Sequence, residues 1–265
     1  MNRATDDQVT ARDDARVTYD VFGVPIDAID LDTAVARIGG WAAAGDSRCV
    51  CICNAHSVVT ARQDPRFGNV IRQADMATPD GAPVAWMGRW QGWPTQARVS
   101  GPDLMLAYCE AAAGRGEPIF LYGSTADTLD KLAAQLQSRW PALVIAGRFA
   151  PPFRPLTRAE DDAAVKLIHD SGARTVWVSL GCPKQETWIA QHRERVRAVM
   201  IGVGAAFDFH AGTQPRAPAW MRDHGLEWLY RLVKEPRRLW RRYLVTNSLF
   251  IGYATLQRLR AMFRG

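Results

Sequence analysis

The residue best suited to acid–base chemistry is Asp80, which lies in the motif TPDGAP at positions 78–83. A Pro-Asp-Gly sequence usually forms only a turn. Here it directly precedes an apolar helical segment and lies downstream of Asn54, so a carboxylate fixed at this point could take a proton from a substrate hydroxyl. An unperturbed aspartate has a pKa of about 3.9, so efficient base catalysis requires desolvation that raises this pKa.

Small, polar or glycine residues follow four segments that are predicted to be strands. They occupy positions 53–56, 121–125, 180–186 and 202–206. In an open parallel sheet, ligands bind beyond the carboxyl ends of the strands. Tyr122 and Gly123 precede a Ser-Thr pair that opens a helix, which predicts either a phosphate site or an ordinary helix cap. Gln185 offers a donor and an acceptor suited to a sugar or a base, unless it belongs to a solvated first turn.

Metal and dinucleotide sites are not favoured. The sequence GVGAA at 202–206 lacks the third glycine and the later acidic residue of a dinucleotide fingerprint. The five histidines show no metal-binding spacing, and His56 is either a crevice residue or a structural histidine. Cys49, Cys51 and Cys53 alternate along one strand, which is more typical of small buried thiols than of a zinc site. We therefore predict no metal and no cofactor.

The positive charge of the chain is concentrated at its C-terminal end. Residues 221–265 contain ten basic and three acidic side chains, whereas the whole chain has a formal net charge of +6. The remainder is therefore close to neutral. Aromatic residues are interleaved with the arginines of this segment. Such a composition predicts contact with an anionic partner, namely a phosphate, a nucleic acid or a lipid surface.

Strand-like and helix-like segments alternate along most of the chain. A short hairpin is predicted at 17–26, and buried strands at 48–53, 118–122, 143–146, 175–180 and 198–202. Helices are predicted between them, at 32–44, 55–63, 65–74, 82–90, 102–113, 125–140, 157–171 and 183–193. Apolar strands with little alternation indicate an α/β fold with a mostly parallel, Rossmann-like sheet covered by helices on both faces. The proline-rich segment 147–156 is predicted to be an exposed loop.

Three regions are expected along the sequence. Residues 1–16 are polar and predicted to be a disordered leader, 17–216 form the α/β domain, and 217–265 form an all-helical appendage. The last helix is predicted at 236–263, as an amphipathic surface element. No secretory signal and no run of about 18 apolar residues is visible, so we expect a cytoplasmic protein that can bind a membrane surface.

Taken together, the motifs resemble the WecG/TagA/CpsF family of bacterial glycosyltransferases. The matching blocks occur in order along most of the chain: NAHSVV at 54–59, PDG at 79–81, RVSGPDL at 98–104, LGCPKQE at 180–186, and GVGAAFD at 202–208 through PRAP at 215–218, followed by GLEW at 225–228 and the arginine cluster. Several ordered blocks are far more specific than any single motif.

The resemblance implies an inverting transfer that does not need a metal. The donor would be a UDP-sugar carrying a hexose or N-acetylhexosamine, such as glucose or N-acetylmannosamine. The acceptor would be a sugar linked to a polyprenyl diphosphate, used in cell-surface polysaccharide biosynthesis. Such a protein would work at the inner face of the cytoplasmic membrane, bound to anionic lipid through its appendage. A homo-oligomer is compatible with this reading, and no nucleic-acid partner is expected.

The same resemblance assigns expected roles to individual residues. Asp80 matches the general base. Substrate-binding positions are Asn54, Arg98, Gly101, Asp103 and Gln185, together with Tyr122 and Gly123 at the strand end described above. Four arginines of the appendage are expected to hold the diphosphate and to close over the site: Arg237, Arg238, Arg241 and Arg242.

One position departs from the family pattern. Ile52 stands two residues before Asn54, where related enzymes often carry a threonine, so a hydroxyl that could bind substrate is missing here. The alternative interpretation is a peripheral membrane or RNA-binding protein whose α/β domain is a catalytically inert scaffold. Basic residues interleaved with aromatics are equally compatible with RNA.

Overall fold

A six-stranded parallel sheet forms the centre of the molecule. We describe a computed structural model, which covers residues 16–263. The strand order is β4-β3-β8-β7-β5-β6, and every pairing is parallel. The strands are β3 (Arg48–Cys53), β4 (Met76–Pro79), β5 (Ile119–Gly123), β6 (Ile145–Phe149), β7 (Thr175–Ser179) and β8 (Val199–Gly202). The predicted α/β, Rossmann-like fold is confirmed.

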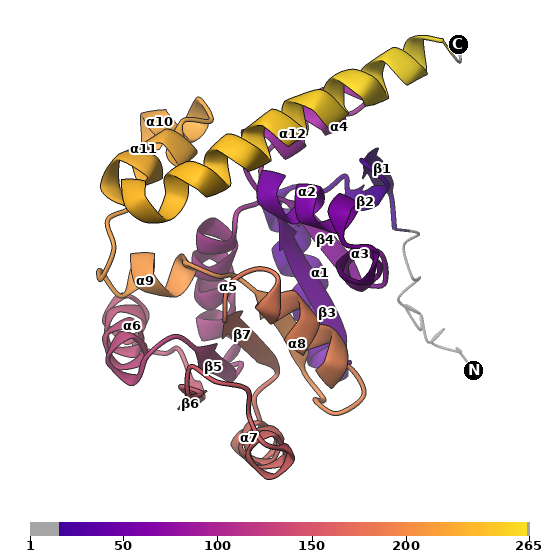
Figure 1. Cartoon of the computed structure of the whole chain (residues 1–265). Helices are drawn as coiled ribbons and strands as arrows, with labels where there is room; N and C mark the ends of the chain where they lie inside the picture. Colours follow the sequence, from indigo (N-terminus) through magenta and orange to yellow (C-terminus); the bar gives the residue numbers. More distant parts are fainter. Residues whose placement is uncertain (1–15, 264–265) are drawn as a thin grey trace, which may run out of the picture.

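Helices cover both faces of this sheet (Figure 1). One face packs against α1 (Leu31–Ala44), α5 (Gly101–Arg115), α6 (Ala126–Arg139) and α9 (Ala206–His210). The other face packs against α2 (Ala55–Gln63), α3 (Pro65–Arg72), α7 (Arg158–Ser171) and α8 (Lys184–His192). Because both faces are covered, the central strands are buried along almost their whole length rather than at alternate residues.

The alternation along β3 explains its three cysteines. Val50 and Ile52 belong to the core on the α1 face, whereas Cys49, Cys51 and Cys53 belong to the cores on the opposite face. All three thiols are buried and free. Burial raises the pKa of Cys49 to about 12, as expected for small core side chains that remain protonated.

The predicted N-terminal hairpin is present and packs beside the sheet. It consists of β1 (Thr18–Val21) and β2 (Val24–Asp27), which pair antiparallel. Arg16 precedes it and donates from Nε to the buried Asp27 carboxylate at 3.0 and 3.1 Å. The rest of the predicted leader, residues 1–15, lies outside the described part of the chain.

Three helices follow the sheet domain, as predicted for the appendage. They are α10 (Ala219–Asp223), α11 (Glu227–Lys234) and α12 (Pro236–Met262). The long helix α12 crosses the molecule above α2 and the hairpin (Figure 1). Phe22 of the hairpin packs edge-on against Phe250 at 4.9 Å, and its backbone N–H donates to Gln257 at 3.1 Å. The appendage is therefore attached to the sheet domain along this helix.

Two edge strands differ from the sequence prediction. Strand β4 was not predicted, because its four residues end in a proline that cannot donate to a neighbouring strand. It is tolerated at the sheet edge, where β4 pairs only with β3. Strand β6 begins later than predicted and runs three residues into the segment expected to be a loop. Gly147 allows this, because a Cβ there would lie 2.5 Å from the Phe120 ring.

Candidate active site

The largest concentration of polar groups lies in a cavity of about 350 Å³ at the carboxyl ends of β3, β4, β7 and β8. We call it the main pocket. Its floor consists of residues that follow these strands, and its roof comes from α11 and α12. Its volume falls in the range of roughly 300–1,000 Å³ that is usual for small-molecule sites. The helix α4 (Ala82–Trp90) begins at its edge.

Asp80 and Asn54 meet in this pocket because they follow adjacent parallel strands. Asn54 caps α2, and its Oδ1 accepts hydrogen bonds from the backbone N–H groups of His56 and Ser57. These bonds fix the side-chain amide, whose Nδ2 donates to Asp80 Oδ2 at 3.5 Å. The backbone N–H of Asp80 donates to Cys53 at 2.9 Å, which continues the strand pairing. The Asp80 backbone is thus fixed to β3, and its carboxylate is held by Asn54.

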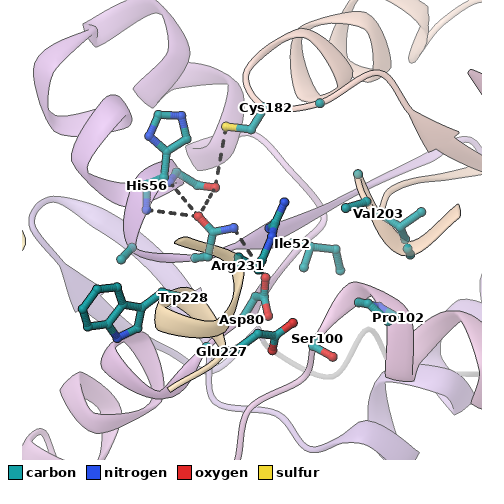
Figure 2. A pocket seen from close by; sticks show the side chains of 18 of the residues that line it. Ile52, His56, Asp80, Ser100, Pro102, Cys182, Val203, Glu227, Trp228 and Arg231 are labelled. Carbon is teal, nitrogen blue, oxygen red and sulfur yellow. Dashed lines mark hydrogen bonds between the residues drawn. The ribbon is translucent and has the colours of Figure 1, made fainter. Parts of the chain in front are cut away.

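The pKa of Asp80 is raised to about 6. Burial is the main cause, and the negative charge of Glu227 acts in the same direction. The Arg98 guanidinium and the hydrogen bond from Asn54 oppose the rise. Figure 2 shows Asp80 facing the cavity with Glu227 on the same side. A carboxylate with this pKa is ionised at neutral pH and is a better base than an exposed aspartate.

Arg98 connects the sheet domain to the appendage. Its Nη1 donates to Glu227 of α11 at 3.2 Å, and its Nη2 lies 3.6 Å from Asp103. Asp103 also binds Arg216 at 2.7 Å and Arg222 at 3.5 Å. Burial opposes ionisation of Asp103, but its hydrogen bonds to Arg216 and Ser100 lower its pKa to about 2. Asp103 therefore organises arginines around the pocket without lining it.

Gly101 lies in the same part of the structure. A Cβ at this position would lie 3.0 Å from the carbonyl oxygen of Val203, so the glycine lets the start of α5 approach the loop after β8. Gly101 does not line the main pocket among the described residues, although Ser100 and Pro102 on either side of it do. Its place in the structure is explained by close packing.

The four arginines predicted to bind diphosphate divide into two pairs. Arg238 and Arg242 are one helical turn apart on α12 and line the main pocket. All four side chains are exposed, but Arg237 and Arg241 lie outside the pocket lining. The sequence did not separate the pairs, because all four belong to the same arginine-rich turns.

Two further arginines face the pocket that sequence reasoning did not single out. Arg222 and Arg231 line it from α10 and α11. The Nε atoms of both are buried and have no hydrogen-bond partner within residues 16–263. Buried donors without partners are costly unless a ligand or water satisfies them. With Arg98, Arg238 and Arg242, the pocket thus carries five arginines suited to a phosphate-bearing ligand.

Gln185 lines the pocket from the start of α8. Its Oε1 accepts from the backbone N–H of Gly204 at 3.0 Å, and its Nε2 donates to Glu186 Oε1 at 2.9 Å. Glu186 is buried, and its Oε2 has no partner among the described residues. Burial raises its pKa to about 7. Glu186 and Glu227 were not predicted as site residues, although both lie in the motifs quoted for the family.

Tyr122 and Gly123 lie outside the main pocket lining. Tyr122 is buried on the α8 face of the sheet, where its ring stacks on Trp188 at 4.3 Å. Gly123 has φ +114°, and a Cβ there would lie 2.2 Å from the carbonyl oxygen of Ser179. The helix that follows has an ordinary cap, because Thr125 Oγ1 accepts from the backbone N–H three residues later at 3.2 Å.

Two other residues considered in the sequence analysis, Ile52 and His56, also line the main pocket. Ile52, the position expected to depart from the family pattern, lines it with an apolar side chain. His56 lines it as well, and burial together with the nearby Arg242 lowers its pKa to about 4, so its imidazole is neutral at pH 7. Within residues 16–263, no three His, Cys, Asp or Glu side chains are grouped so that they could hold a metal ion.

Comparison with known families agrees with this geometry. The model of the "Glycosyl transferase WecG/TagA/CpsF family" matches residues 19–264, which is nearly the whole chain. The match extends over the sheet domain, every element that lines the main pocket, and the helical appendage. A family of this kind transfers a sugar from a donor to an acceptor in cell-surface polysaccharide synthesis. The chain belongs to the WecG/TagA/CpsF family of glycosyltransferases.

Proposed function

We propose that this protein is an inverting, metal-independent glycosyltransferase that moves a hexose or N-acetylhexosamine from a UDP-sugar to a polyprenyl-diphosphate-linked sugar. The main support is one juxtaposition. Asp80, whose pKa is raised to about 6, shares a single pocket with Arg222, Arg231, Arg238 and Arg242. A base for the acceptor and cations for the leaving group are the two requirements of such a transfer.

In the proposed reaction, Asp80 takes the proton from the acceptor hydroxyl. The hydroxyl oxygen forms a bond to the anomeric carbon of the donor while the bond from this carbon to the diphosphate oxygen breaks. UDP leaves with the electron pair of that bond, and attack from the opposite face inverts the anomeric centre. Asn54 keeps the Asp80 carboxylate in place through its Nδ2.

The arginines would stabilise the charge that develops on the departing diphosphate. Each guanidinium can donate two parallel hydrogen bonds to phosphate oxygens. Arg238 and Arg242 project from successive turns of α12, and Arg231 projects from α11. The appendage therefore supplies these donors above the pocket floor that carries Asp80. We propose that these cations take the role that a divalent metal has in many nucleotide-sugar enzymes.

We also propose that the appendage binds anionic lipid at the inner face of the cytoplasmic membrane. No helix among residues 16–263 is long and apolar enough to cross a bilayer. Outside its pocket-lining residues, α12 nevertheless exposes large apolar side chains, including Trp240 and Leu244, beside exposed arginines. Apolar residues flanked by cations are suited to the lipid interface, at about 1 kcal/mol per well-placed charge.

The proposal is tested by measuring UDP release from a panel of UDP-sugars with a lipid-diphosphate sugar, in the presence of EDTA. We expect turnover with one or more donors and an inverted anomeric configuration in the product. A retained configuration would contradict the single displacement. No turnover with any donor, together with tight RNA binding, would favour the alternative of an RNA-binding protein with an inert α/β domain. Co-sedimentation with anionic and neutral vesicles tests the membrane contact separately.

A further inference from the structure

A second cavity of about 590 Å³ lies between α4 and α12. We call it the α4–α12 groove. Its lining is almost wholly apolar, with Trp86 and Trp90 from α4 and Ile251, Leu259 and Met262 from α12. All five of these side chains are exposed. Exposed apolar surface gathered in one concave place marks an interaction site rather than ordinary surface variation.

The groove has fixed walls. Helix α12 is fastened to the hairpin by the Phe22–Phe250 contact at 4.9 Å, and Gln257 Nε2 donates to the carbonyl of Asp20 at 2.9 Å. On the groove side, the Arg258 guanidinium lies 5.1 Å from the ring centre of Trp90 and connects α12 to α4. The shape is therefore set by packing on both sides of α12, not by a free helix end.

The groove is continuous with the main pocket. Four residues line both cavities: Ala55, Pro83, Trp228 and Asn247. On one side of this junction the lining carries five arginines and four carboxylates, Asp80 among them, and on the other side Arg258 is the one charged residue among the described lining. Two of these arginines, Arg222 and Arg231, have buried Nε donors without a partner among the described residues. An apolar channel that opens into a pocket with such donors complements a molecule with an anionic head and a hydrocarbon chain.

From this continuity we propose that the α4–α12 groove binds the hydrocarbon chain of the lipid diphosphate whose sugar-bearing head enters the main pocket. This inference rests on the proposed function and adds a binding site for the acceptor chain within the protein itself. The two tryptophans of α4 belong to the sheet domain, so this domain contributes to lipid binding as well as the appendage. If the groove instead bound a second copy of the chain, its connection to the charged main pocket would have no explanation.

The test is a binding measurement that does not depend on turnover. Farnesyl diphosphate, below its micelle concentration, and inorganic diphosphate are titrated into the full-length protein by calorimetry. The groove predicts that farnesyl diphosphate binds at least about tenfold more tightly, since its chain leaves water. Equal affinity for the two ligands would overturn the proposal.

Two pairs of variants locate the chain. Thr255→Trp fills the groove from an exposed position, and Ser248→Trp places the same side chain on α12 outside both linings. Thr255→Trp is expected to abolish the preference for farnesyl diphosphate without changing inorganic diphosphate affinity, whereas Ser248→Trp leaves both unchanged. Trp90→Ala removes a side chain of the groove instead of filling it. Its control is Trp220→Ala, which removes an exposed tryptophan outside both linings. Equal effects within each pair would contradict the proposal.

Two further results separate this inference from its alternatives. If chain-dependent binding persists while no UDP-sugar is turned over, the groove proposal stands and the proposed function fails. If turnover is the same with chain-free and farnesyl-linked acceptors, the proposed function stands and the groove proposal fails. Sedimentation across protein concentrations provides the remaining check: a dimer that Thr255→Trp abolishes would identify the groove as a subunit contact and overturn the proposal.

Discussion

Replacing Asp80 with asparagine should stabilise the protein in a way that depends on pH. The wild-type carboxyl has a pKa of about 6 when folded and 3.8 when unperturbed. Below the lower value the group is protonated in both the folded and the unfolded states and contributes nothing. As pH rises, the unfolded state loses its proton first, so the wild-type free energy of unfolding falls until the folded pKa is passed.

The size of this effect follows from the two pKa values. At about 1.4 kcal/mol per pH unit, ionised Asp80 destabilises the fold by up to roughly 3 kcal/mol relative to an exposed aspartate. Asparagine has the same shape and no charge. Between pH 4 and pH 8, the stability of Asp80→Asn relative to wild type should therefore increase by about 2 to 3 kcal/mol.

Urea unfolding followed by tryptophan fluorescence at both pH values measures this difference. The control is Asp130→Asn, which removes an exposed carboxylate whose ion-pair partner, Arg148, is also exposed. We expect no comparable change with pH for this control. If the difference between Asp80→Asn and wild type were the same at pH 4 and pH 8, Asp80 would not be a desolvated carboxylate, and the argument for a tuned base would fail.

Three other perturbations give sharp outcomes. Arg242→Gln should lower kcat/KM about tenfold to a hundredfold because it removes a charge-assisted phosphate contact, whereas Arg241→Gln, outside the main pocket lining, should stay within about twofold in the UDP-release assay. Gly123→Ala should destabilise the fold by several kcal/mol through its clash with the β7 carbonyl, whereas Gly172→Ala, with positive φ and open space, should cost about 1 kcal/mol; thermal unfolding compares them. Glu186→Gln should bind the donor with the affinity of wild type, because glutamine keeps an acceptor for the Gln185 side-chain amide. Glu186→Leu has no such acceptor and should bind the donor about tenfold more weakly, as measured by calorimetry.

The sheet and most helices were predictable because their signals are local. Buried strands without alternation and helices with clear caps give the same pattern in the sequence as in the fold. Strand β4 was missed because it is short and ends in Pro79, so only its pairing with β3 makes it a strand. The displaced start of β6 likewise depends on pairing with β5, which the sequence does not display.

Several individual site residues were predictable from the sequence, but which side chains the fold brings together in the pocket was less so. Asp80 and Asn54 meet as expected, because both follow neighbouring parallel strands. The arginines of α12 could not be sorted from the sequence, since which side of the helix faces the pocket depends on how the appendage docks. Glu186 was passed over for a different reason. Its importance comes from burial and an unpartnered oxygen, which are properties of the folded chain.

The central claim is that Asp80 is the base of a sugar transfer, and one measurement tests it most directly. Wild type and Asp80→Asn are compared for UDP release with a lipid-diphosphate-linked sugar, at a donor concentration shown by calorimetry to saturate both. The account predicts that Asp80→Asn binds the donor with an affinity close to that of wild type but turns it over at least about a hundredfold more slowly. A near-normal rate with saturating donor would contradict it and would remove Asp80 from the reaction.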